Sequence, residues 1–135
     1  MLEDDIKQHN ISIFEAYKAL GDFDLAVFTC SPKSTAEIAW LLAKVEIPVY
    51  CPLYDKRVRI NRHTKATIIK VFPLLSGYVF VALGRDEVLI GDRFRSLVRR
   101  LTFDGFPATV KMSELMDIKG QPELRKLVSR ETPNT

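Results

Sequence analysis

The chain has 135 residues, of which 47% are hydrophobic and 27% are charged. At roughly 100–200 residues per domain this length predicts one main domain, and the composition excludes collagen-like, low-complexity and wholly disordered chains. No apolar run approaches the roughly 18–20 residues of a membrane-spanning helix, and the acidic start, Met1 to Asp5, is unlike a signal peptide. We therefore expect a cytoplasmic domain without a membrane partner, in which Cys30 and Cys51 stay reduced.

The formal net charge of +3 hides an uneven distribution of charge. Residues 1–24 hold six acids against two lysines, a net −4, so the rest of the chain carries +7. No acid interrupts the basic run from Lys56 to Lys70, and a second cluster comprises Arg93, Arg95, Arg99 and Arg100. Such clusters suit a polyanion or an acidic protein surface, with a solvated face as an equal alternative.

Residues 1–23 predict an acidic helical extension ahead of the main domain. Ser12 and Glu15 form a capping box, so we expect the helix to begin there. Gly21 is placed to end it. The apolar run 25–30 then predicts a buried strand.

A second capping box, Ser34 with Glu37, predicts a helix over residues 34–45. Its apolar stripe comprises Ile38, Leu42 and Val45. Trp40 lies off this stripe, so the helix is apolar around too much of its circumference for one buried face. We favour cover of Trp40 by the N-terminal helix, and a homodimer or partner contact through the Trp40 face is the alternative.

Two β-branched or alternating segments, 57–60 and 66–71, predict a protruding hairpin that carries the first basic cluster. A central apolar strand is expected at 76–83. Two short strands follow at 98–103 and 108–110.

Ser113 is placed to cap a helix over 114–118. Residues 119–135 predict a C-terminal helix and tail. The whole order predicts an α+β fold, an antiparallel sheet flanked by helices.

Catalytic chemistry has no support in the sequence. His9 and His63 are not near cysteines or carboxylates at ligand spacing, and the two cysteines lack the paired CxxC units of a zinc site. Gly84 and Gly91 are isolated and make no phosphate-binding loop. The sequence therefore predicts a binding protein, not an enzyme, without a cofactor or metal.

One segment resembles a known family. Residues 72–81 read Phe-Pro-Leu-Leu-Ser-Gly-Tyr-Val-Phe-Val and resemble the signature PLFPGYVFV of the NusG-type N-terminal domain, shared by NusG and RfaH. Residues 50–53 look like the family's "FLP" element, and residues 101–110 look like its "FVGFGG-PAPV" segment. The resemblance covers about residues 24–118 and implies a ferredoxin-like sandwich. At Ser76 the family has proline.

The resemblance implies a transcription elongation or antitermination factor that bridges the cleft of RNA polymerase. Residues that match the family's pocket for the β′ clamp helices are Tyr78, Phe80, Phe103 and Thr29. Residues in the region that approaches the β lobe and upstream DNA are Arg93 and Arg95. Hairpin residues expected to lie against phosphate are Arg57, Arg59, Arg62 and Lys65. Plain core packing is an equal alternative for Phe80.

The family's KOW barrel has no counterpart here, so we expect a pared-down factor of bacteriophage or mobile-element type that competes with NusG. The alternative is a small RNA-binding or dimerising α+β interaction module. Residues 76–83 partly match the RNA-recognition-motif strand but lack its basic first residue and aromatic last residue.

Overall fold

The computed structural model describes residues 2–82 and 94–118. Its elements are α1 (Leu2–Leu20), β1 (Asp24–Cys30), η1 (Pro32–Ser34), α2 (Thr35–Lys44), β2 (Val49–Tyr50), β3 (Leu53–Arg59), β4 (Thr67–Pro73), β5 (Tyr78–Ala82), β6 (Val98–Arg100), β7 (Thr102–Phe103), β8 (Phe106–Pro107), β9 (Thr109–Lys111) and α4 (Met112–Met116). The α+β prediction is confirmed. The helix predicted within 119–135 lies outside the described residues.

The main sheet is antiparallel, with strand order β2-β5-β1-β6, and β9 also pairs with β1. β5 is central, as predicted, and pairs with β1 from Leu25 opposite Ala82 to Thr29 opposite Tyr78. The two central strands of the sheet are therefore β5 and β1.

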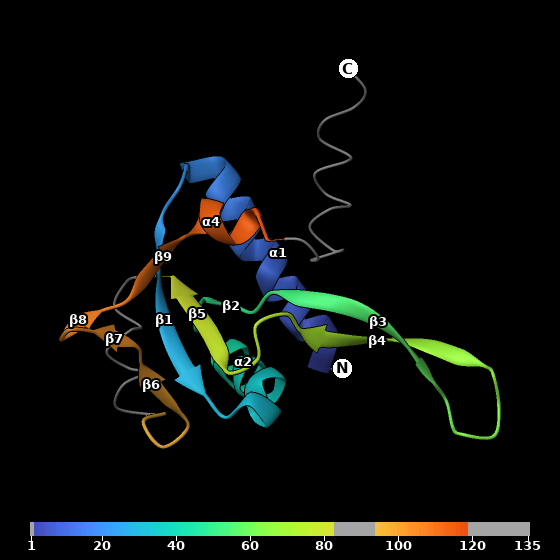
Figure 1. The fold of residues 1–135 in the computed structure, drawn as a ribbon. Helices are drawn as coiled ribbons and strands as arrows, with labels where there is room; N and C mark the ends of the chain where they lie inside the picture. Colours follow the sequence, from blue (N-terminus) through green and yellow to red (C-terminus); the bar gives the residue numbers. More distant parts are fainter. Residues whose placement is uncertain (1, 83–93, 119–135) are drawn as a thin grey trace.

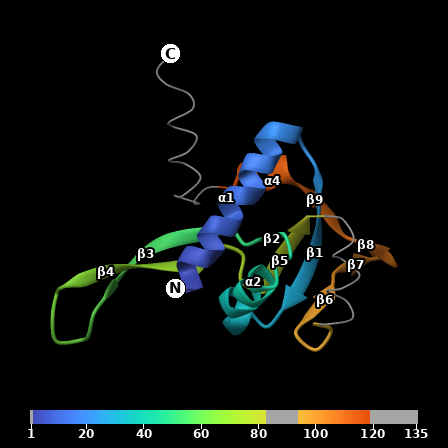
Figure 2. The same cartoon turned by 180° about the vertical axis from the view of Figure 1, so that it is seen from behind.

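Helix α2 lies on one side of this sheet, and α1 packs along the edge formed by β2 (Figures 1 and 2). Because successive strand residues point to opposite faces, β1 divides its side chains between two core clusters. Ala26 and Phe28 pack in the cluster that contains α2, and Leu25 and Val27 pack in the cluster that contains α4. Helix α1 contributes to both clusters, through Ile6 in the first and through Ile13 and Phe14 in the second.

The predicted start of α1 is wrong. The helix begins at Leu2, ten residues before the capping box, and Ser12 is an exposed residue in its middle. Ile6, Asn10 and Ile13 are spaced by three or four residues and are buried, so tertiary packing extends the helix toward the N-terminus past the local cap signal. The predicted end is confirmed. Gly21 has φ +89°, and its N–H donates to the carbonyl of Tyr17 at 2.9 Å.

A buried amide ties α1 to the sheet. The side chain of Asn10 is fully buried; its Nδ2 donates to the carbonyl of Cys51 at 2.7 Å, and its Oδ1 accepts from the N–H of Cys51 at 2.9 Å. Cys51 lies between β2 and β3, where the chain leaves the main sheet for the hairpin. Asn10 therefore supplies the hydrogen bonds that sheet pairing does not supply to Cys51.

Helix α2 is in the predicted place but begins differently. Ser34 makes no side-chain cap bond. The neighbouring Thr35 is fully buried; its hydroxyl donates to the carbonyl of Pro32 at 2.9 Å and accepts from the N–H of Gly77 at 2.8 Å. Thr35 thus anchors the helix start to the turn before β5. Val45, predicted in the apolar stripe, is instead 37% exposed.

Helix α1 covers Trp40, as we favoured. The indole Nε1 of Trp40 donates to Oδ2 of Asp5 at 2.8 Å, and Nζ of Lys44 lies 4.5 Å from the centroid of the ring system. These contacts hold the indole at the α1–α2 interface. The homodimer through this face stays a prediction.

The protruding hairpin is confirmed. β3 and β4 pair from Leu53 opposite Pro73 to Arg59 opposite Thr67, and the pair extends away from the rest of the molecule (Figure 1).

The C-terminal part of the described chain returns to α1. Helix α4 begins at Met112, so Ser113 lies inside the helix and not at its predicted cap position. The N–H and hydroxyl of Ser113 instead donate to the carboxylate of Asp22, at 3.0 and 2.6 Å. The hydroxyl bond is the main cause that lowers the pKa of Asp22.

Candidate functional site

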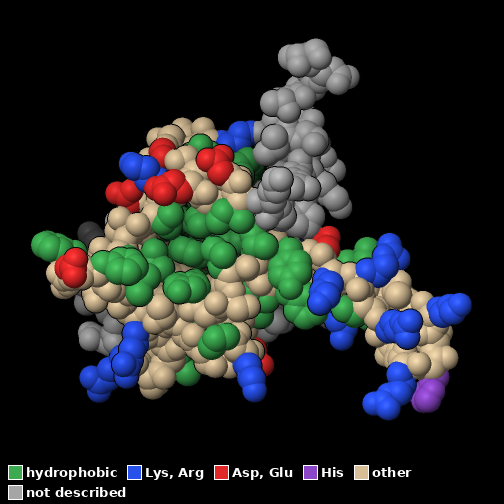
Figure 3. Space-filling view, in the orientation of Figure 1, with side chains coloured by type: hydrophobic (Ala, Val, Ile, Leu, Met, Phe, Trp, Pro, Cys, Tyr) green, Lys and Arg blue, Asp and Glu red, His purple; other side chains and the backbone are tan. Residues whose placement is uncertain are grey.

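The face of the sheet opposite α2 carries an apolar patch. Figure 3 shows hydrophobic side chains gathered over β1 and β5 on this face. Tyr78 is 40% exposed here, and Thr29 lies directly opposite it on β1. Leu101 and Ala108 are partly buried beside the same cluster. We call Tyr78, Thr29, Leu101 and Ala108 the sheet patch.

Phe80 does not belong to the surface of this patch. Its side chain is 4% exposed and lies in the core cluster that includes α4. On β5 it is flanked by Val27 of β1 and Tyr50 of β2, which occupy the directly opposed positions of the neighbouring strands. The resemblance implied a contact with the clamp helices, but the structure buries this side chain. The cluster that encloses this ring includes Phe14 of α1 and Met112 and Leu115 of α4.

Two phenylalanines project beside the sheet patch. Phe103 and Phe106 lie opposite each other in the small β7–β8 hairpin and are 66% and 75% exposed. Asp104 and Gly105 between them have φ values of +49° and +80°, as in a type I′ turn. The structure therefore exposes Phe103, as the resemblance implied, and adds Phe106. The Asp-Gly pair between two aromatic residues is the sequence signal that could have identified Phe106.

Basic residues lie along one side of the sheet patch. Arg95 and Arg99 line a shallow pocket of about 300 Å³ together with Thr29, whose hydroxyl donates to the carbonyl of Arg99 at 3.4 Å. Arg93, predicted to act with Arg95, lies outside the described residues. Cys30 also lines this pocket, and burial is the main cause that raises the pKa of its thiol, so the group is protonated at neutral pH.

The predicted basic residues of the hairpin are all exposed. Arg57 and Arg59 are two positions apart on β3 and so share one face, where Nη1 of Arg57 donates to Oγ1 of Thr67 at 3.2 Å. Arg62 and Lys65 lie in the loop that joins the strands. Figure 3 shows these cations spread along the projecting arm, away from the sheet patch. The structure thus separates the predicted phosphate contacts from the predicted protein contacts.

Comparisons of the chain with family models, with curated proteins and with solved structures find no match. The NusG-type resemblance therefore stays a prediction. Among the described helices, none is long and apolar enough to cross a membrane. Within residues 2–82 and 94–118, no group of three His, Cys, Asp or Glu side chains is placed to hold a metal ion.

Proposed function

We propose that this protein binds RNA polymerase and acts as a transcription elongation or antitermination factor. The observation that carries the proposal is the sheet patch, a partly exposed and largely apolar surface at the central strands β1 and β5, together with a basic hairpin that projects from another part of the molecule. This is the combination that the resemblance to NusG-type domains implies. The exposed rings of Tyr78 and Phe103 are the anchors that a pair of clamp helices would bury.

The mechanism follows from where the two surfaces lie. The sheet patch supplies apolar contact with Arg95 beside it, and the hairpin supplies charge at a separate place on the molecule. A protein held at two such places across a cleft binds the closed cleft better than the open one. Only this difference in affinity can shift the equilibrium. About 1.4 kcal/mol of difference gives a tenfold bias toward the closed, elongating state.

The exposed rings provide the test of polymerase binding. We expect the double variant Tyr78→Ala and Phe103→Ala to weaken retention on immobilised RNA polymerase by about tenfold or more, because truncating two anchors at an interface costs at least about 1–2 kcal/mol each. Added NusG is expected to displace the wild-type protein. The matched control is Leu41→Ala on α2, since Leu41 is 38% exposed and distant from the sheet patch. Full retention of the double variant, or indifference to NusG, would contradict the proposal.

The hairpin provides a second, independent test. Replacing Arg57 and Arg59 by alanine is expected to weaken binding to duplex DNA equally for unrelated sequences. It should also reduce the slope of log affinity against log salt by about 0.9 for each phosphate that is no longer bound. Fluorescence anisotropy over a salt series measures both effects. The control pair, Lys56→Ala and Lys70→Ala, removes the same charge from the opposite face of the hairpin. An unchanged slope in the arginine variant would contradict a phosphate contact.

The RNA-binding alternative has weaker support. Base stacking on an RNA-recognition-motif strand needs several exposed aromatic side chains. On β5, Tyr78 is exposed, but Val79, Phe80 and Val81 are buried.

A further inference from the structure

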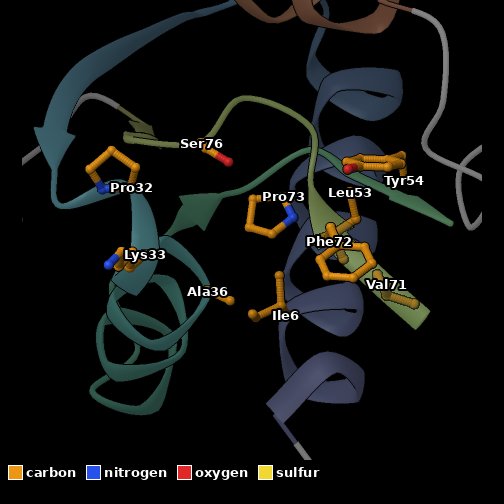
Figure 4. Close-up of a pocket in the computed structure, with 10 residues that line it drawn as sticks. All are labelled: Ile6, Pro32, Lys33, Ala36, Leu53, Tyr54, Val71, Phe72, Pro73 and Ser76. Atoms are coloured by element: carbon orange, nitrogen blue, oxygen red, sulfur yellow. The ribbon is translucent and has the colours of Figure 1, made fainter. Parts of the chain in front are cut away.

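An apolar pocket lies at the root of the β3–β4 hairpin, where the hairpin meets α1 and α2. Its volume is about 390 Å³, within the range of ligand-binding pockets. Ile6 of α1, Ala36 of α2 and Val71 of β4 form apolar walls, and Tyr54 and Phe72 line the side toward the hairpin (Figure 4). The two rings lie 5.8 Å apart between centroids.

One lysine lines this pocket, and two more lie on the hairpin beside it. Lys33 is one of its lining residues. Lys56 and Lys70 are directly opposed across β3 and β4, two positions further along the strands than Tyr54 and Phe72 and therefore on the same face as these rings. None of the three lysines makes an ion pair with any residue in 2–82 or 94–118.

The opposed side chains of Lys56 and Lys70 favour a negatively charged ligand. Like charges directly across two strands destabilise a sheet by a few tenths of a kcal/mol up to about 1 kcal/mol. An anion placed between Lys56 and Lys70 would remove this repulsion. A ligand that contacts both the apolar pocket and the two lysines needs an apolar group that enters the pocket and a negative charge next to that group.

We propose that this pocket binds an acidic segment of a partner protein, which inserts one large apolar side chain between α1, α2 and the hairpin root. A nucleotide fits less well, because the hydrogen-bonding edge of a base would face Ile6, Ala36 and Val71 without partners. The proposal does not depend on polymerase binding, since the sheet patch is on the other face of the sheet.

The test uses the full chain and a fluorescein-labelled short peptide with one phenylalanine flanked by glutamates. We expect saturable binding by fluorescence anisotropy, and chemical-shift changes at the amides of Ala36 and Val71. Replacing the peptide's phenylalanine by alanine, or its glutamates by lysines, is expected to weaken binding by about tenfold or more, which corresponds to at least about 1.4 kcal/mol.

Three protein variants localise the site. Ser76→Trp places a bulky ring at an exposed residue of the pocket rim, and Lys56→Glu with Lys70→Glu reverses the nearby charge. Lys33→Glu is an independent variant on another element, in case the tryptophan disturbs folding. Each is expected to lower affinity for the acidic peptide by about tenfold or more. Arg95→Glu with Arg99→Glu makes the same charge change beside the sheet patch, away from this pocket, and is expected to alter affinity by less than about threefold.

Several results would overturn this inference. The first is failure of the acidic peptide to bind. The second is equally tight binding of the lysine-flanked peptide. The third is wild-type affinity in both the Ser76 and the Lys33 variants. Equal loss in the Arg95 and Arg99 variant would also overturn it, since attraction would then be general and not local. Failure here with retained polymerase binding would leave the proposed function intact, and the converse result would leave the pocket intact.

Discussion

Phe80→Ala is expected to lower the free energy of unfolding by about 3–5 kcal/mol, the range for large-to-small substitutions of a buried aromatic ring. The side chain is 4% exposed and packs in the core cluster that joins the sheet to α4. Removing the ring leaves a cavity beside Val27 and Tyr50, whose strands pair with β5 on both sides and limit collapse into the space. Urea unfolding followed by circular dichroism measures the loss as a shift of the midpoint at constant slope.

Tyr78→Ala is the matched comparison for this experiment. Tyr78 is on the same strand but is 40% exposed, so we expect a loss of about 1 kcal/mol or less. The contrast has a practical consequence, because weak polymerase binding by Phe80→Ala would report unfolding and not the removal of an interface side chain. If Phe80→Ala kept the wild-type midpoint and still failed to bind polymerase, Phe80 would be an interface residue after all.

Asn10→Ala is expected to cost about 2–4 kcal/mol. The substitution removes two hydrogen bonds to the backbone of the buried Cys51, and each lost bond to a buried backbone group costs about 1–3 kcal/mol. Alanine has a higher helix propensity than asparagine, which offsets about 0.5 kcal/mol of this loss in the free energy of unfolding. Thermal and urea unfolding are the measurements. Because Cys51 is where the chain leaves β2 for the hairpin, we also expect faster amide hydrogen exchange near this junction.

Gln8→Ala is the control for Asn10→Ala. Gln8 lies on the same helix but is exposed, so the change is expected to stay within about 0.5 kcal/mol. Asn10→Asp separates the two hydrogen bonds, because aspartate keeps the acceptor but loses the donor and buries a charge. We expect it to be at least as destabilising as alanine at neutral pH. A loss below about 0.5 kcal/mol for Asn10→Ala would mean that the junction does not depend on this side chain.

The two faces of the sheet explain how a small domain can present two surfaces. Helix α2 covers one face, and a pocket remains where α1 and α2 meet the hairpin root. The other face keeps the sheet patch with Tyr78, and Phe103 projects beside it. The proposed polymerase contact and the proposed peptide contact are therefore separable by mutation.

Local patterns alone were enough for the α+β class, for the hairpin and for the end of α1. Alternating and β-branched residues with a polar turn specify β3 and β4, because a period of two side chains defines a strand. Gly21 specifies the helix end, because the left-handed conformation favours glycine. These signals act between residues close in the chain, so a single sequence is sufficient to read them.

Only the tertiary structure decided which residues of the candidate site reach the surface. Phe80 and Tyr78 are two positions apart on one strand face, yet Phe14, Met112 and Leu115 pack in the cluster that encloses Phe80, and Tyr78 stays 40% exposed. Tertiary contacts also determine where α1 begins, because contacts of Ile6 and Asn10 with distant parts of the chain stabilise its first turns. Exposure depends on neighbours far away in the sequence, and no local pattern of residues specifies them.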